Sequence, residues 1–365
     1  FRRGAALLLG VTALGVVPAA PTVTAAPDSL GAGGEYFPVT PTRIYDQAGI
    51  NADGSVDIGV VGVGGVPADH VLAVAVNVTI ANVPGRGFAS VSPSDYVPGS
   101  SDRTSLINFQ YDGHTVPNFG IVGVGTEGAI TVDLETPRVD GQARVIVDVF
   151  GFVTTSSFES TPEVAEEDGS RMITVTPGRL VDTREPGGPT GGATMSAGQS
   201  IEVPIRGAGP VPDSADVTAV VVNMTGINNR PGNTKTYLAA TPELVTSGSD
   251  TSNGNYPSGV TKANLAIVPL NDDGSIFVYN NRGQIHVALD VVAYLQDGGD
   301  AESRTGRIVP LEAPFRSFDT RGAEFGGARL GYSSWEDWSF EAFAGSVRLN
   351  GVDAVSYTHI RAHET

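Results

Sequence analysis

The chain of 365 residues has no cysteine, only two tryptophans and few positive charges. The lack of cysteine excludes disulfides, thiolate metal sites and cysteine nucleophiles. Its 22 Lys and Arg stand against 40 Asp and Glu, which gives a net charge of −18. This balance argues against nucleic acid or an anionic membrane as a partner, because phosphate groups need a basic surface. Within residues 172–295, no segment carries apolar residues at helical spacing over ten or more positions.

Glycine and proline, by contrast, are abundant, with 47 and 24 residues, as is usual for a chain with many tight turns. An Arg-x-x-Asp motif occurs three times, and its aspartates are 136 and 137 residues apart: Arg43–Asp46, Arg179–Asp182 and Arg316–Asp319. Further landmarks keep their order in the first two occurrences: Asn77-Val-Thr with Asn223-Met-Thr, and Arg144–Phe152 with His286–Tyr294. The chain therefore contains tandem copies of one unit of about 130 residues.

This self-similarity predicts a repeat at residues 36–153 (copy one) and another at 172–295 (copy two). Acidic stretches without apolar periodicity, 154–171 and 296–306, are interpreted as linkers. A third copy, 307–355, is cut short. The tail 356–365 departs from the repeat and resembles translated sequencing-adapter read-through, as found at the ends of metagenomic assemblies. We expect the natural protein to continue with the rest of the third copy.

The N-terminus predicts export. Arg2 and Arg3 precede an apolar run and then small residues up to Ala26, the order of a secretory signal, so residues 1–26 are interpreted as a signal peptide. The run, Ala5–Val17, is short for a membrane span of about 20 residues. A retained anchor is the alternative to cleavage. We expect a secreted or cell-surface protein with no membrane contact beyond this segment.

The segments of copy two predict strands. Ile201–Arg206 alternates apolar and polar residues, as a half-buried strand does. Four others are rich in β-branched or aromatic residues: Val217–Ile227, Lys262–Pro269, Ser275–Asn280 and Gln284–Leu295. Asn271–Gly274 predicts a hairpin turn. About eight strands per copy predict an all-β fold of tandem β-sandwich or jelly-roll domains, with a β-barrel as the alternative.

The Arg-Leu-Val-Asp-Thr-Arg sequence at Arg179–Arg184, with the downstream Asn-x-Thr and Val-Asp-Val-x-x-Tyr pattern, resembles a repeat of secreted proteins of actinobacteria and related lineages. Such repeats occur in tandem or appended to envelope hydrolases. The resemblance covers nearly all of residues 36–295 and the start of the third copy. It implies an exported accessory module without an assigned catalytic role. Copy one departs from the pattern, because Gln47 and Ala48 stand where copy two has Thr183 and Arg184.

The Asp and Arg residues of the motif suggest either acid–base chemistry or an internal clamp. The clamp is favoured because Asp290 falls on a mostly apolar face with Ala288, Val292 and Tyr294, opposite Val287, Leu289, Val291 and Leu295. Asp148 lies equivalently, with Ile146, Phe150 and Phe152. A partly buried carboxylate needs a partner. The sequence therefore predicts inter-strand pairs between Arg43 and Asp148 and between Arg179 and Asp290.

Other polar residues have plain interpretations. Asn77 and Asn223 lie in the most apolar strands, where we expect them to bind backbone groups and not a glycan. Asp272 and Asp273 belong to a turn and not to a calcium loop, because the alternating oxygen ligands are absent. Trp335 and Trp338 either pack within the third copy or stack on sugar rings. The sequence predicts no catalytic residue, metal or cofactor.

The favoured function is a non-enzymatic exported repeat protein that acts as a spacer, adhesion or envelope-binding module. Its partner would be an envelope polysaccharide or another surface protein. The alternative is a carbohydrate-binding accessory region of a larger cell-wall hydrolase. An enzyme that uses the motif would need Asp182, Arg184 and Asn223 exposed together in a pocket.

Overall fold

The computed structural model of the chain describes residues 33–51, 54–97, 104–137, 141–155, 169–230, 232–298 and 305–311. The regular elements in these residues are all β-strands, as predicted, and no helix among them is long and apolar enough to cross a membrane. The expected signal peptide, the tail 356–365 and residues 312–355 of the third copy lie outside the described residues. With them lie four of the singled-out positions: Arg316, Asp319, Trp335 and Trp338.

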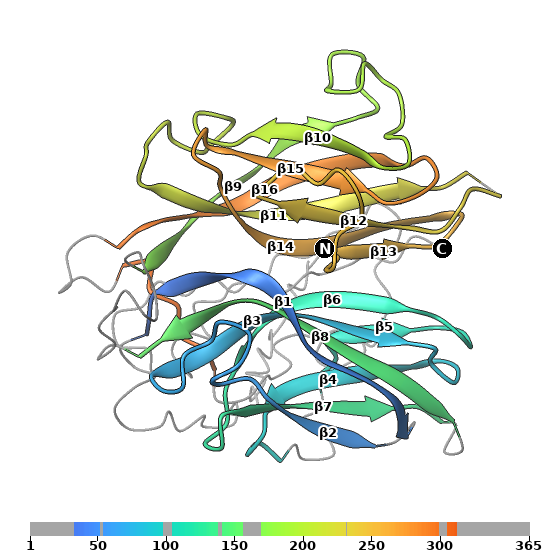
Figure 1. The fold of residues 1–365 in the computed structure, drawn as a ribbon, viewed down its shortest axis with the longest axis vertical. Helices are drawn as coiled ribbons and strands as arrows, with labels where there is room; N and C mark the ends of the chain where they lie inside the picture. The colour runs from blue at the N-terminus through green and yellow to red at the C-terminus, as the bar shows by residue number, and fades with distance from the viewer. Residues whose placement is uncertain are drawn as a thin grey trace, which may run out of the picture.

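Each of the two full copies contains eight strands (Figure 1). Those of copy one are β1 (Tyr36–Asn51), β2 (Ser55–Gly59), β3 (Val71–Ala81), β4 (Gly87–Pro93), β5 (Ile107–Phe109), β6 (Val116–Gly123), β7 (Ala129–Glu135) and β8 (Gln142–Thr154). Those of copy two are β9 (Ser170–Asp182), β10 (Gln199–Pro204), β11 (Val217–Asn228), β12 (Thr236–Thr241), β13 (Gly254–Tyr256), β14 (Val260–Pro269), β15 (Ser275–Asn280) and β16 (His286–Asp297).

Within each copy the strands form two antiparallel layers in jelly-roll order, which confirms the predicted sandwich. The inner layer of copy one is β1-β8-β3-β6 and its outer layer is β2-β7-β4-β5. Copy two repeats this order with β9-β16-β11-β14 and β10-β15-β12-β13. The sheets of the described residues end in edge strands, so they do not form the alternative barrel.

The two inner layers join into one eight-stranded sheet. Strand β1 pairs with β9 where Tyr36 lies opposite Ser170. At this junction Arg171 Nη2 donates to Glu35 Oε1 at 3.0 Å. Glu35 and Arg171 are 136 residues apart, which is the repeat length, so they occupy equivalent positions in the two copies. Contact between equivalent positions is typical of two units related by a local two-fold axis.

Apolar residues cover both faces of the inner layers. On β3, Val76 and Val78 point into the core of copy one, whereas Ala75 belongs to a third apolar cluster between the copies. Val221 of β11 and Phe119 of β6 belong to the same third cluster, which spans both copies. The face that a lone sandwich would expose to water is therefore buried against the other copy.

Bulges change which face some residues occupy. Val287, Leu289 and Val291 pack in the core of copy two as expected, but Leu295 belongs to the cluster between the copies. The expectation for Leu295 was wrong because the register of β16 shifts between Val291 and Ala293. Phe152 of copy one, expected on the face of Asp148, likewise packs in the core of copy one.

The expected linkers are shorter than the sequence suggested. Strand β8 continues to Thr154 and β9 begins at Ser170, while β16 runs to Asp297. These strand ends contain acidic and small residues and lack the apolar alternation by which strands were predicted. Their polar side chains bind the other copy, as Arg171 binds Glu35. Residues 156–168 and 299–304 lie outside the described residues.

The predicted turn at Asn271–Gly274 forms, but it is not a hairpin turn, because it connects β14 of the inner layer to β15 of the outer layer and these strands do not pair. Gly274 adopts φ 76°, which a side chain disfavours, and its N–H donates to the Asn271 carbonyl at 2.9 Å. Both aspartates of this segment are part of the turn.

The shared cluster predicts that the two copies unfold together. We expect one calorimetric transition for the chain and two transitions for Val221→Asp, which buries an unpaired carboxylate between the copies at a cost of about 3 kcal/mol. The exposed Leu244→Asp is the matched control and should keep one transition. Two transitions in the unmodified chain would contradict this interpretation.

Candidate functional site

Each copy holds its motif arginine against a carboxylate on the neighbouring strand. In copy one, Arg43 on β1 lies opposite Asp148 on β8, with Nε 2.8 Å from Oδ1 and Nη2 3.3 Å from Oδ2. In copy two, Arg179 on β9 lies opposite Asp290 on β16, with the same two contacts at 2.8 and 3.0 Å. The structure thus brings together both pairs that the sequence proposed. Two parallel hydrogen bonds make this one of the stronger side-chain contacts.

The pair in copy one contains a buried charge. The side chain of Asp148 is 1% exposed, whereas that of Arg43 is 40% exposed. Burial raises the pKa of Asp148, and the hydrogen bonds and charge of Arg43 offset part of the rise. Arg43 is therefore what allows a charged carboxylate on this covered face.

The second carboxylate of the motif is neutralised in a different way in each copy. In copy two, Arg184 places Nε 2.9 Å and Nη2 2.6 Å from Asp182, and Arg179 Nη1 adds a contact of 3.0 Å. In copy one, Arg144 from β8 places Nε 2.5 Å and Nη2 2.8 Å from Asp46. The missing arginine at Ala48 is thus replaced from another strand.

Sequence reasoning missed the role of Arg144. The signal was present in the repeat alignment, where Arg144 stands at the position of His286. In copy two that histidine contacts a hydroxyl instead, with Nδ1 3.1 Å from Thr183 Oγ1. Copy one has an arginine only at the first of these two positions (Arg144), and copy two only at the second (Arg184). This exchange indicates that the two arginines substitute for each other.

The motif of copy one also faces copy two. Arg43 Nη2 donates to the Asp250 carbonyl at 3.3 Å, and Asn77 Nδ2 donates to the Ser252 carbonyl at 2.7 Å. Both carbonyls belong to the loop between β12 and β13. Asn77 is fully buried, so it binds backbone as expected, but the backbone is that of the other copy. Its equivalent in copy two, Asn223 of β11, lies opposite Asp290 of β16 and is half-buried.

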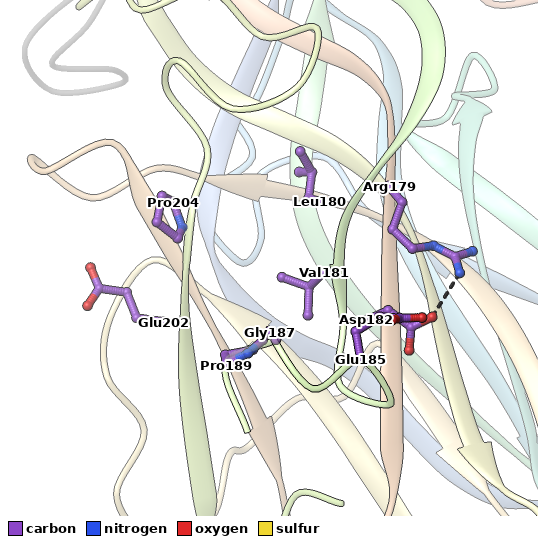
Figure 2. A pocket seen from close by; sticks show the side chains of 10 residues that line it. Arg179, Leu180, Val181, Asp182, Glu185, Gly187, Pro189, Glu202 and Pro204 are labelled. Carbon is purple, nitrogen blue, oxygen red and sulfur yellow. Dashed lines mark hydrogen bonds and ion pairs between the residues drawn. The ribbon is translucent and has the colours of Figure 1, made fainter. Parts of the chain in front are cut away.

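An open pocket of about 440 Å³ adjoins the motif of copy two (Figure 2). It lies between the end of β9, the loop that follows and strand β10. Its lining is Arg179, Leu180, Val181, Asp182, Glu185, Gly187, Gly188, Pro189, Glu202 and Pro204. Asp182 lines it, but Arg184 and Asn223 do not, so the exposed cluster required for the enzyme hypothesis does not form. No group of three potential metal ligands occurs among the described residues.

No family model and no curated protein matches the chain. Among solved structures, the CBM22-1–CBM22-2 tandem domain from Paenibacillus barcinonensis Xyn10C is 12% identical and covers 74% of this chain and 96% of its own, with a TM-score of 0.16. The complex of plant peptide RALF23 with FER and LLG2 is 11% identical, with 73% and 92% covered and a TM-score of 0.19. TM-scores this low carry no argument about function. The resemblance to the actinobacterial repeat stays a prediction.

The buried pair predicts unequal costs for its two halves. Arg43→Met leaves a buried carboxylate unpaired and should lower the free energy of unfolding by about 3 kcal/mol at pH 7. Asp148→Asn leaves Arg43 free to bind water and should cost about 1 kcal/mol. Urea denaturation measures both. A larger loss for Asp148→Asn than for Arg43→Met would contradict the clamp.

The exchange of arginines predicts a rescue. Arg184→Ala should lower the free energy of unfolding by about 1 kcal/mol, because the arginine is half exposed. Adding His286→Arg copies the position of Arg144 and should restore most of the loss, whereas His286→Arg alone should gain nothing. Equal effects of His286→Arg in both backgrounds would show that the arginines do not share a role.

Acid should weaken the motif. Hydrogen bonds from Arg184 hold the pKa of Asp182 well below its usual range, and those from Arg144 lower the pKa of Asp46. A carboxyl whose pKa is lower in the folded chain stabilises above its unfolded pKa of about 4 and loses this effect as the pH falls through the folded pKa. We expect the free energy of unfolding to fall from pH 4 to 2, and to fall less in Asp182→Asn. An identical pH dependence in that variant would exclude Asp182 as a cause.

Proposed function

We propose that the chain is a non-enzymatic exported repeat protein whose paired copies form a rigid spacer, adhesion or envelope-binding module. One observation carries the proposal: the motif residues shared by the copies bind one another or the neighbouring copy. Arg43 binds Asp148 within copy one and the Asp250 carbonyl of copy two. The motif arginine of copy one thus stabilises both its own sandwich and the contact between the copies. These contacts give the motif residues a structural role.

The apolar cluster between the copies supports the rigid part of the proposal. It buries Tyr36 and Phe150 of copy one with Val221 and Leu295 of copy two. Buried apolar area stabilises an interface by about 25 cal/mol per Å². Strand pairing at the β1–β9 junction adds a backbone connection. The two copies therefore form one block and are not independent domains joined by a flexible linker.

A carbohydrate-binding accessory region is the second candidate, and the ring of Tyr111 favours it. This tyrosine is 50% exposed and stacks on His114 with ring centroids 4.2 Å apart. A tyrosine held from one side offers its other face to a sugar ring. Envelope polysaccharide is the partner that both candidates share.

Incubation of the full chain with purified envelope polysaccharides tests the proposal. We expect no release of reducing ends at any pH, whether or not the polysaccharide is retained in a pull-down. Release that Asp182→Asn or Asp148→Asn abolishes would overturn the non-enzymatic assignment. Retention that Tyr111→Ala abolishes, with Tyr237→Phe as the control, would favour the carbohydrate-binding candidate over the spacer.

A further inference from the structure

Copy two contains a loop that copy one lacks. Strand β1 ends at Asn51 and β2 begins at Ser55, whereas β9 ends at Asp182 and β10 begins only at Gln199. Copy one folds into the same jelly roll with a shorter connection, so the extra length of this loop is not needed for the jelly-roll order, although Met195 within it packs in the core of copy two. Long ordered loops on a rigid scaffold commonly carry binding functions.

The loop is fixed before any ligand arrives. Thr183 is fully buried and its Oγ1 accepts the Val287 N–H at 2.9 Å. Thr190 Oγ1 donates to the Thr183 carbonyl at 3.1 Å, and the Gly188 N–H donates to the Glu185 carbonyl at 2.9 Å. A preformed loop lowers the entropic cost of binding.

The pocket beneath this loop combines apolar walls with acidic rims. Leu180, Val181, Pro189 and Pro204 supply the walls. In the view of Figure 2, Val181 and Pro189 lie between Glu185 on the loop and Glu202 on β10.

The charges of the lining do not cancel. Arg179 is already neutralised by Asp290 and Asp182, with contacts of 2.8 and 3.0 Å. The carboxylates of Glu185 and Glu202 are exposed, and neither forms a hydrogen bond or ion pair with another described residue. The pocket thus combines two unpaired negative charges at its rim with apolar walls.

We propose that this pocket binds a lysine or arginine side chain of a basic partner peptide. The methylene groups of such a side chain pack on Pro189 and Pro204, while its charged end pairs with Glu185 or Glu202. A neutral sugar fits less well because the lining contains no aromatic ring. This inference goes beyond the proposed function and stands whether or not the chain binds polysaccharide.

Fluorescence anisotropy of a labelled hexalysine peptide with the full chain tests the proposal. We expect saturable binding that weakens at least tenfold in Glu185→Gln/Glu202→Gln. The chain is strongly acidic overall, so the control Glu127→Gln/Glu243→Gln removes the same charge from exposed positions away from the pocket. That control should change the affinity less than twofold.

Three results would overturn the proposal. Equal weakening in both double variants would assign the binding to net charge, and an absence of saturable binding would exclude a basic peptide. A glucosamine hexamer that binds with the affinity of hexalysine, and with the same loss in Glu185→Gln/Glu202→Gln, would assign the pocket to an amino sugar polymer.

Discussion

The central strands of each inner sheet, β3 in copy one and β11 in copy two, are covered on both faces, and most other features follow from this constraint. One face packs on the outer sheet of its own sandwich and the other on the second copy. On β3 all residues except Val71 are buried. A polar group on such a sheet costs free energy unless it finds a partner inside the protein. Asp148 therefore pairs with Arg43, and Asn77 binds the Ser252 carbonyl of the other copy.

The two copies neutralise the motif aspartate with different residues. Each keeps a motif aspartate on its first strand and neutralises it with a second guanidinium, from Arg144 in copy one and Arg184 in copy two. Arg144 lies within β8, and in copy one a short turn joins β1 to β2. Arg184 instead sits at the start of a long loop, which builds a pocket. The shared residues thus stabilise the block, and the residues that differ between copies give copy two a surface of its own.

Much of this arrangement was predictable from local patterns. Alternation and turn residues located five of the eight strands of copy two to within two residues, but not β9, β12 and β13. The apolar neighbours of Asp148 and Asp290 predicted the arginine pairs. The covering of the second face was not predictable, because bulges at Val291 and Val149 shift the side-chain alternation by one residue. Pairing between the copies depends on contacts such as Asn77 with Ser252, which are 175 residues apart. No local pattern reports a contact of that range.

The central claim is that the two copies form one rigid block, and a distance between two spin labels tests it most directly. The chain has no cysteine, so Glu127→Cys in copy one and Glu243→Cys in copy two provide unique attachment sites. Pulsed electron paramagnetic resonance on the doubly labelled chain measures the distribution of distances between them. The account predicts a single narrow peak that does not change with salt. A broad distribution, or several peaks whose weights change with salt, would contradict it.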